Sequence, residues 1–223
     1  MRMRKKRNLE ERIAACGDYI LTLEHDVLDS NLAEQNPCYI DFEALFGNAN
    51  PVHLEIGCGK GRFACECARH NPDVNFLAVE KSRNVIVMGG EEAKRRQIPN
   101  LRFVDSGAEY LRRYIPDGSI ERIYLNFSCP FPKTSYANRR LTNKRFLEIY
   151  KHILKQDGEI HQKTDNMHFF EYSIEQYSLC GFILRNVSLD LHASGMKGNI
   201  VTEYEEKFAS LGNPIYRLEA HIR

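Results

Sequence analysis

From residue 52 onward the chain alternates short apolar runs with amphipathic stretches. Apolar runs of about four to eight residues are typical of buried strands, and apolar residues that recur every three or four positions are typical of helices. We expect strands at residues 52–56, 76–79, 101–104, 122–127, 159–163, 182–189 and 215–222. We expect helices at residues 62–70, 83–97, 108–114, 143–155 and 167–179.

Turn-forming residues separate these elements. Pro99 stops the second helix, Thr142 caps the start of the fourth, and the Asp-Gly pair at residues 157–158 ends it. Because strands alternate with helices, the pattern favours an α/β fold with a mostly parallel sheet covered on both faces. The last two strands need no crossover helix between them and form an antiparallel pair, so we expect seven strands.

The first 38 residues differ from the rest of the chain. Residues 8–35 are charged and have a helical pattern, and a basic run precedes them: Arg2, Arg4, Lys5, Lys6 and Arg7. We therefore expect a basic N-terminal arm and helical extension over residues 1–38 and one α/β domain over residues 39–223. The formal net charge is only +1, so a nucleic-acid partner has to be argued from such local clusters.

Cysteine usage and hydropathy narrow the class of protein. No apolar run is long enough to cross a membrane, and the N-terminus lacks the apolar core of a signal peptide. The seven cysteines form no C-x-x-C pair and no metal-ligand spacing with histidine. We expect a cytoplasmic protein with reduced cysteines and no bound metal.

The first expected strand runs into three glycines at alternate positions, in the segment LEIGCGKG. Glycine lacks a Cβ, so the backbone can turn tightly and a ligand can approach closely. A glycine-rich turn between a strand and a helix binds nucleotides. Glu55 precedes Gly57, Gly59 and Gly61, and Glu80 ends the second strand, where a carboxylate can accept both ribose hydroxyls. Together these residues resemble the S-adenosylmethionine site of Rossmann-like methyltransferases.

Polar residues follow the other expected strands, and the carboxyl ends of parallel strands meet at one edge of a sheet. Asp105 and Gly107 follow the third strand and are suited to contact an adenine. The fourth strand leads to a loop that prolines stiffen and that carries Cys129. Basic residues come next: Lys133, Arg139, Arg140, Lys144 and Arg145. This cluster favours a phosphate backbone held beside the methyl donor.

Acidic residues gather late in the chain. Asp165 follows the fifth α/β strand, and the last connection carries Thr202, Glu203, Tyr204 and Glu205. A carboxylate can accept both the N1–H and the exocyclic amine of guanine, so these acids suit a guanine pocket. Acids also suit the first turn of a helix, where the helix dipole favours negative charge. For Glu203 and Glu205 both interpretations stay open.

These motifs together resemble one family, the bacterial tRNA (guanine-N7-)-methyltransferases. The resemblance runs from about Arg4 to the C-terminus and is most specific in the segments LEIGCGKG, AVEKS, NRRLT, HQKTDN and GNIVTEYEEKFASLGNPIYRLE. It implies a Rossmann-like class I methyltransferase fold. It also implies methyl transfer from S-adenosylmethionine to N7 of a guanine in the tRNA variable loop, by a monomer or homodimer that binds tRNA.

The resemblance further implies roles for individual residues. Those that bind S-adenosylmethionine are Glu55, Gly57, Gly59, Gly61, Glu80, Asp105, Gly107 and Cys129. Those that bind the substrate are Lys133, Arg139, Arg140, Asp165, Thr202, Glu203, Tyr204 and Glu205. Cys129 and Asp165 are the candidates for catalysis.

Two positions depart from the family's pattern. Cys129 stands where the family has an aspartate, and Gly107 stands where it has an acid, two residues after Asp105. Asp105 or backbone amides cover the second loss. Guanine N7 carries a lone pair and no proton, so catalysis rests on alignment and electrostatics. We therefore expect an active enzyme in which Cys129 is a weaker substitute for the carboxylate.

Two other functions fit parts of the sequence. Cys129 beside Pro130 resembles the nucleophile of RNA cytosine-C5 methyltransferases, which add to C6 to activate the ring. A non-catalytic protein that binds S-adenosylmethionine and tRNA would also keep the donor motifs. The motifs that surround Cys129 favour the N7 family over both.

Overall fold

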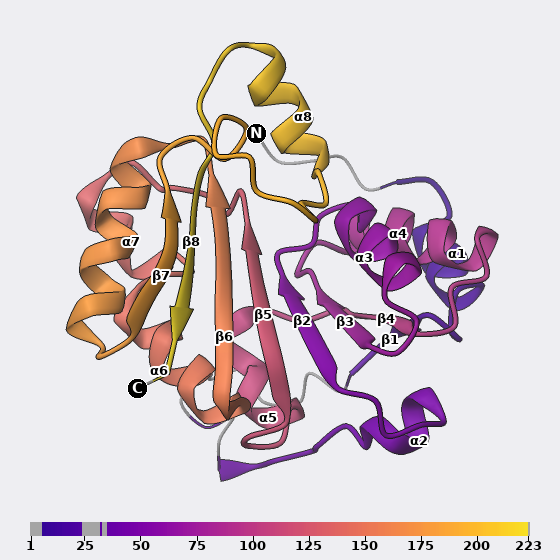
Figure 1. The fold of residues 1–223 in the computed structure, drawn as a ribbon. Helices are drawn as coiled ribbons and strands as arrows, with labels where there is room; N and C mark the ends of the chain where they lie inside the picture. The colour runs from indigo at the N-terminus through magenta and orange to yellow at the C-terminus, as the bar shows by residue number, and fades with distance from the viewer. Residues whose placement is uncertain (1–5, 24–31, 33–34, 223) are drawn as a thin grey trace. The chain divides into compact units, whose positions relative to one another are not determined.

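The structure, a computed structural model, describes residues 6–23, 32 and 35–222. The chain divides into two compact units, Met1–Tyr114 and Ile115–Arg223. In each unit strands alternate with helices, as the sequence predicts (Figure 1). None of the described helices is long and apolar enough to cross a membrane.

The first unit contains four parallel strands in the order β1, β4, β3, β2. Its elements are α1 (Leu9–Ala14), β1 (Ile20–Leu21), α2 (Phe42–Phe46), β2 (Val52–Ile56), α3 (Arg62–His70), β3 (Asn75–Val79), α4 (Arg83–Arg95), β4 (Leu101–Val104), the 3-10 turn η2 (Ala108–Tyr110) and α5 (Leu111–Tyr114). Every residue of β2 and β3 is buried, as is typical of parallel strands covered on both faces.

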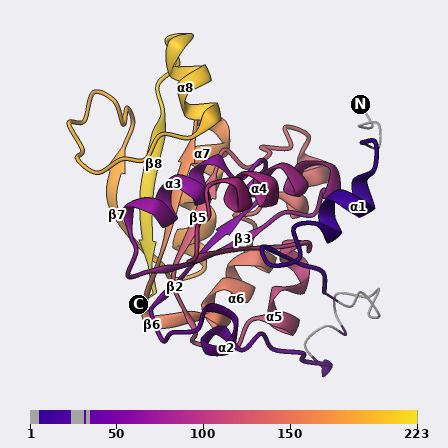
Figure 2. The ribbon, with the colours of Figure 1, turned by 90° about the vertical axis from the view of Figure 1, so that its right-hand side faces the viewer.

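The N-terminal segment corrects one prediction. Helix α1 ends at Ala14, and β1 pairs with β4 where a continuous helix over residues 8–35 was expected. The amide of Phe103 on β4 donates to the carbonyl of Tyr19 at 2.7 Å, so the segment covers the free edge of the sheet. Helix α1 packs on α4, where Arg12 pairs with Glu91 at 2.7 Å (Figure 2). The basic run at residues 2–5 and residues 24–31 and 33–34 lie outside the described residues.

The second unit contains four strands in the order β5, β6, β8, β7. Its elements are β5 (Ile120–Asn126), the 3-10 segment η3 (Thr134–Arg139), α6 (Lys144–Ile153), β6 (Leu154–Thr164), α7 (Met167–Leu179), β7 (Ile183–Ser188), α8 (Glu203–Ser210) and β8 (Tyr216–His221). β5 and β6 are parallel, whereas β8 runs antiparallel to both β6 and β7. The terminal antiparallel pair is therefore confirmed, and with β1 the described residues form eight strands instead of seven.

One helix start in the second unit differs from the prediction, and another decides between two interpretations that the sequence left open. Helix α6 is capped by Asn143, whose side chain accepts from the amide of Arg145 at 3.2 Å, so the prediction that Thr142 is the cap was wrong. The hydroxyl of Thr142 is fully buried and lies 2.9 Å from that of Ser173 on α7. Helix α8 occupies the connection before β8, so Glu203 does begin a helix.

Candidate active site

The glycine turn after β2 has the conformation that its sequence requires. Gly57, Gly59 and Gly61 have φ of 76°, 57° and 75°, in the left-handed region that other residues rarely adopt. The amides of Gly57 and Cys58 both donate to the carbonyl of Val79, at 2.8 and 3.1 Å, which ties the turn to the end of β3. A Cβ on Gly59 would meet nothing within 4 Å, whereas one on Gly61 would lie 2.6 Å from the ring of Phe103. Of these two glycines, Gly59 is therefore the one with open space beside it.

Glu80, at the end of β3, is built into the same turn. One carboxylate oxygen accepts from the amide of Gly59 at 3.2 Å and the other from the amide of Ser82 at 2.8 Å. The carboxylate is half-buried and is held in place by backbone groups, which orients its remaining lone pairs. Glu55 is the second-last residue of β2 and is buried.

The turn after β4 holds two acidic side chains near Gly107. Asp105 is buried and forms an ion pair with Arg83 at 2.9 Å, and Arg83 also pairs with Glu10 of α1 at 2.8 Å. A Cβ on Gly107 would lie 2.6 and 3.1 Å from the two carboxylate oxygens of Glu109. In an aspartate the carboxylate oxygens lie about 2.4 Å from the Cβ. The carboxylate of Glu109 therefore lies beside Gly107, nearly as close to the Cβ position as the carboxylate of an aspartate at residue 107 would be.

Arg140 organises the loop that follows β5. Its guanidinium donates to the carbonyls of Pro130 and Phe131, at 2.9 and 3.0 Å, and lies over the ring of Tyr172 at 4.3 Å. Cys129, the residue before Pro130, is exposed. The exposed residues Lys133 and Arg139 also belong to this segment, Arg139 with its guanidinium 4.7 Å from the ring centroid of Tyr136.

A buried ion pair fixes the start of α8. The ammonium of Lys163, on β6, lies 2.9 Å from a carboxylate oxygen of Glu205 and also donates to the side chain of Asn199 and the carbonyl of Ile200. Thr202 and Glu205 form a reciprocal capping box, and both are buried. Two of the residues predicted to bind substrate are thus engaged in holding α8, which Figure 1 shows beyond the carboxyl end of β6.

The other predicted substrate residues of this unit are accessible. Glu203 and Tyr204 are exposed on α8, and Asp165 is half-buried directly after β6. Sequence reasoning missed Lys163, Glu109 and the clamping role of Arg140. A lysine at the carboxyl end of an expected strand was the signal for the first of these, because a buried ammonium needs a partner.

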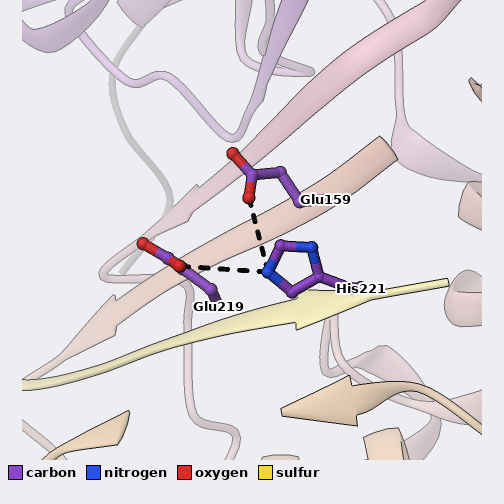
Figure 3. A group of neighbouring side chains, drawn as sticks. All are labelled: Glu159, Glu219 and His221. Carbon is purple, nitrogen blue, oxygen red and sulfur yellow. Dashed lines mark ion pairs between the residues drawn. The ribbon is translucent and has the colours of Figure 1, made fainter. Parts of the chain in front are cut away.

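One face of β6 and β8 carries a separate charged cluster. Glu159, Glu219 and His221 place one ligand atom each within 4.8 Å of one another, with the imidazole 3.5 and 3.9 Å from the two carboxylates (Figure 3). Arg122 pairs with Glu159, and Arg217 pairs with Glu219. A cation would have to compete with these two guanidinium groups, so we assign the cluster to the ion-pair network of the sheet.

Comparison with known proteins identifies the family. A family described as putative methyltransferases matches residues 49–218. A tRNA (guanine-N(7)-)-methyltransferase of Geobacillus sp. (strain WCH70) is 45% identical over 219 residues, which are 98% of this chain and 94% of that protein. The chain belongs to the tRNA (guanine-N7-)-methyltransferase family. A member from Streptococcus thermophilus (strain CNRZ 1066) is 40% identical over the full length of both chains.

Solved structures agree with this assignment at the level of the fold. A 16S rRNA methyltransferase, KamB, aligns with a TM-score of 0.62 at 15% identity, over 83% of this chain and 94% of its own. A structure described as an antibiotic related methyltransferase aligns with a TM-score of 0.61 at 17% identity, over 89% of this chain and 97% of its own. The predicted Rossmann-like methyltransferase fold is confirmed.

Proposed function

We propose that the chain transfers a methyl group from S-adenosylmethionine to N7 of a guanine in the variable loop of tRNA. The observation that carries the proposal is full-length similarity to proteins named for this activity, at 40% to 45% identity. The open turn at Gly59 and the oriented carboxylate of Glu80 support the proposal, because both belong to the donor motif that such an activity requires.

The first unit holds the donor. S-adenosylmethionine carries the methyl group on a sulfonium centre. When the methyl group is transferred, the neutral thioether leaves without an acid to protonate it. The turn at Gly57, Gly59 and Gly61 lets the ligand approach the backbone, and Glu80 accepts from hydroxyl groups of the ribose. Glu55 and Asp105 complete the acidic lining. Glu109 supplies the carboxylate that Gly107 lacks, which supports adenine recognition in spite of that departure.

The second unit binds and orients the acceptor. Guanine N7 attacks with its own lone pair, so the enzyme has no proton to remove and acts by alignment. Asp165 accepts from the N–H groups of guanine or balances the charge that develops on the imidazole ring. Cys129 stands in the loop held by Arg140, and Lys133 and Arg139 contact phosphates. Thr202 and Glu205 act indirectly, by positioning Glu203 and Tyr204.

Chemical cleavage of tRNA tests the proposed function. N7-methylguanine sites become sensitive to aniline after borohydride reduction, so tRNA methylated by the purified protein should be cut in the variable loop. Unmodified tRNA transcript incubated without S-adenosylmethionine is the control. Intact tRNA after incubation with the donor would refute the proposal, and a covalent adduct with 5-fluorocytosine RNA would replace it by cytosine-C5 chemistry.

A further inference from the structure

Three aromatic rings lie together at the carboxyl end of β5, beside α8. The ring centroids of Phe127, Tyr204 and Phe208 are separated by 6.2 Å, 6.1 Å and 6.3 Å, pair by pair. Their planes differ by 22°, 19° and 18°. In a column of stacked rings the outer two would be twice as far apart as neighbours, so the equal spacing excludes a column. The three rings form a cluster whose faces are nearly parallel.

Helix α8 departs from the pattern of an ordinary surface helix at two positions, Tyr204 and Glu205. Such helices bury apolar residues and expose charged ones. In α8, all of whose residues are described, Glu205 is the buried residue and Tyr204 is 55% exposed. The buried pair between Glu205 and Lys163 holds the helix in this orientation. An exposed aromatic side chain that belongs to a cluster of rings indicates an interaction site.

Phe127 contributes its ring through an unfavourable backbone conformation. Its φ of 49° lies in the left-handed region, which costs a bulky residue free energy. Its amide donates to the carbonyl of Lys163 at 2.8 Å, so the residue that anchors α8 also fixes the backbone of Phe127. Strain retained at such a position is typical of functional sites.

A positive charge accompanies the rings. The ammonium of Lys207 lies 5.4 Å from the ring centroid of Phe208, and Lys207 is exposed. Parallel aromatic faces next to a cation match an unpaired nucleotide, whose base stacks while its phosphate meets the charge. We propose that Phe127, Tyr204 and Phe208 form an aromatic surface on which an unstacked base of the tRNA stacks. The inference rests on tRNA being the substrate.

Substitution of the most exposed ring tests the stacking surface. Tyr204→Ala should weaken the affinity for unmodified tRNA transcript by about 5- to 150-fold, the range that loss of one base–aromatic stack gives. Tyr204→Phe keeps the ring and should bind as the wild type does. Leu211→Ala is the matched control, because Leu211 ends α8, is 67% exposed and takes no part in the ring cluster. Thermal unfolding and S-adenosylmethionine affinity of each variant show whether the fold and donor site are intact.

A fluorescent base identifies which nucleotide stacks. We place 2-aminopurine in the transcript at the position of the target guanine or at a neighbouring position. The wild type and Tyr204→Phe should quench its fluorescence, and Tyr204→Ala should quench it less. Equal tRNA affinity and equal quenching for Tyr204→Ala and Leu211→Ala would overturn the inference. If Tyr204→Ala changed only the sedimentation of the protein without tRNA, the inference would also be overturned, because the aromatic surface would then join two copies of the chain. If the wild type binds and quenches these probes but forms no N7-methylguanine in the unmodified transcript, the proposed function is refuted and the stacking surface still stands.

Discussion

Glu205 either anchors α8 through its ion pair with Lys163 or binds the substrate, and the variant Glu205→Gln distinguishes these two roles. The carboxylate is fully buried and lies 2.9 Å from the ammonium of Lys163, which also meets Asn199 and the carbonyl of Ile200. Glutamine keeps the shape of the side chain and removes its charge. The ammonium is then left buried with two neutral acceptors, so the folded state should lose stability.

The expected magnitude follows from the burial of the pair. Removing one partner of a buried ion pair costs about 3–5 kcal/mol of unfolding free energy, because the other charge stays desolvated. A native domain has only about 5–15 kcal/mol in total. With a urea dependence of about 3 kcal/mol per molar, a loss of about 4 kcal/mol lowers the urea midpoint by about 1.3 M.

Urea unfolding followed by circular dichroism measures this shift. Glu206→Gln is the matched control, because Glu206 is a neighbouring acid on α8 that is exposed, and its midpoint should stay near that of the wild type. Replacing both partners, as in Lys163→Met with Glu205→Leu, should recover much of the loss, since no buried charge remains.

A substrate role for Glu205 would give the opposite pattern. If Glu205→Gln keeps the wild-type urea midpoint and hydrogen exchange of α8, yet raises KM for tRNA, then Glu205 is a ligand of the substrate. The assignment of Glu205 as the anchor of α8 would then be wrong.

Three further expectations follow from the site and the sheet. Glu109→Ala should weaken S-adenosylmethionine binding by about tenfold in calorimetry, as expected for the loss of one charged hydrogen bond. Adding Gly107→Asp to this variant should restore binding. Unchanged binding in Glu109→Ala would contradict the role of Glu109 in holding the donor. Cys129→Ala should slow methyl transfer to unmodified tRNA without abolishing it, and Cys129→Asp should equal or exceed the wild type; complete loss in both would show that the thiol itself is required. Burial raises the pKa of Glu159, but the hydrogen bond and charge of His161 and the charge of Arg122 outweigh it and lower this pKa from 4.5 to about 2. Stability from Glu159 is therefore present above pH 4.5 and lost as the pH falls towards 2, by about 3 kcal/mol at most. Urea midpoints of Glu159→Gln between pH 5 and 3 should fall less steeply than those of the wild type, and parallel slopes would refute this account.

Local patterns predicted the elements that local interactions form. The turn at Gly57, Gly59 and Gly61 is an example, because positive φ is a property of each residue and glycine alone adopts it freely. The start of α8 is also formed by local contacts, since Thr202 and Glu205 form a capping box with each other, although the sequence left open whether its acids begin a helix or bind guanine. Such features need no knowledge of distant parts of the chain.

Long-range contacts account for the predictions that failed. β1 exists because Ile20 and Leu21 pair with β4, about eighty positions along the chain, and no local periodicity announces that pairing. Thr142 looks like a helix cap but is drawn inward by Ser173, so Asn143 caps α6 instead. In each case a partner distant in sequence overrode the local preference.

Sequence motifs alone were enough to predict the α/β order, the glycine turn, the acidic positions at the strand ends and the family. Motif spacing suffices for these because it reflects local backbone geometry and ligand chemistry. The roles of the late polar residues depended on the fold: Glu205 pairs with Lys163 inside the second unit, whereas Tyr204 is exposed beside Phe127. The physical reason is that a buried charge needs its partner nearby in space, and the fold, which brings residues 163 and 205 together, selects that partner.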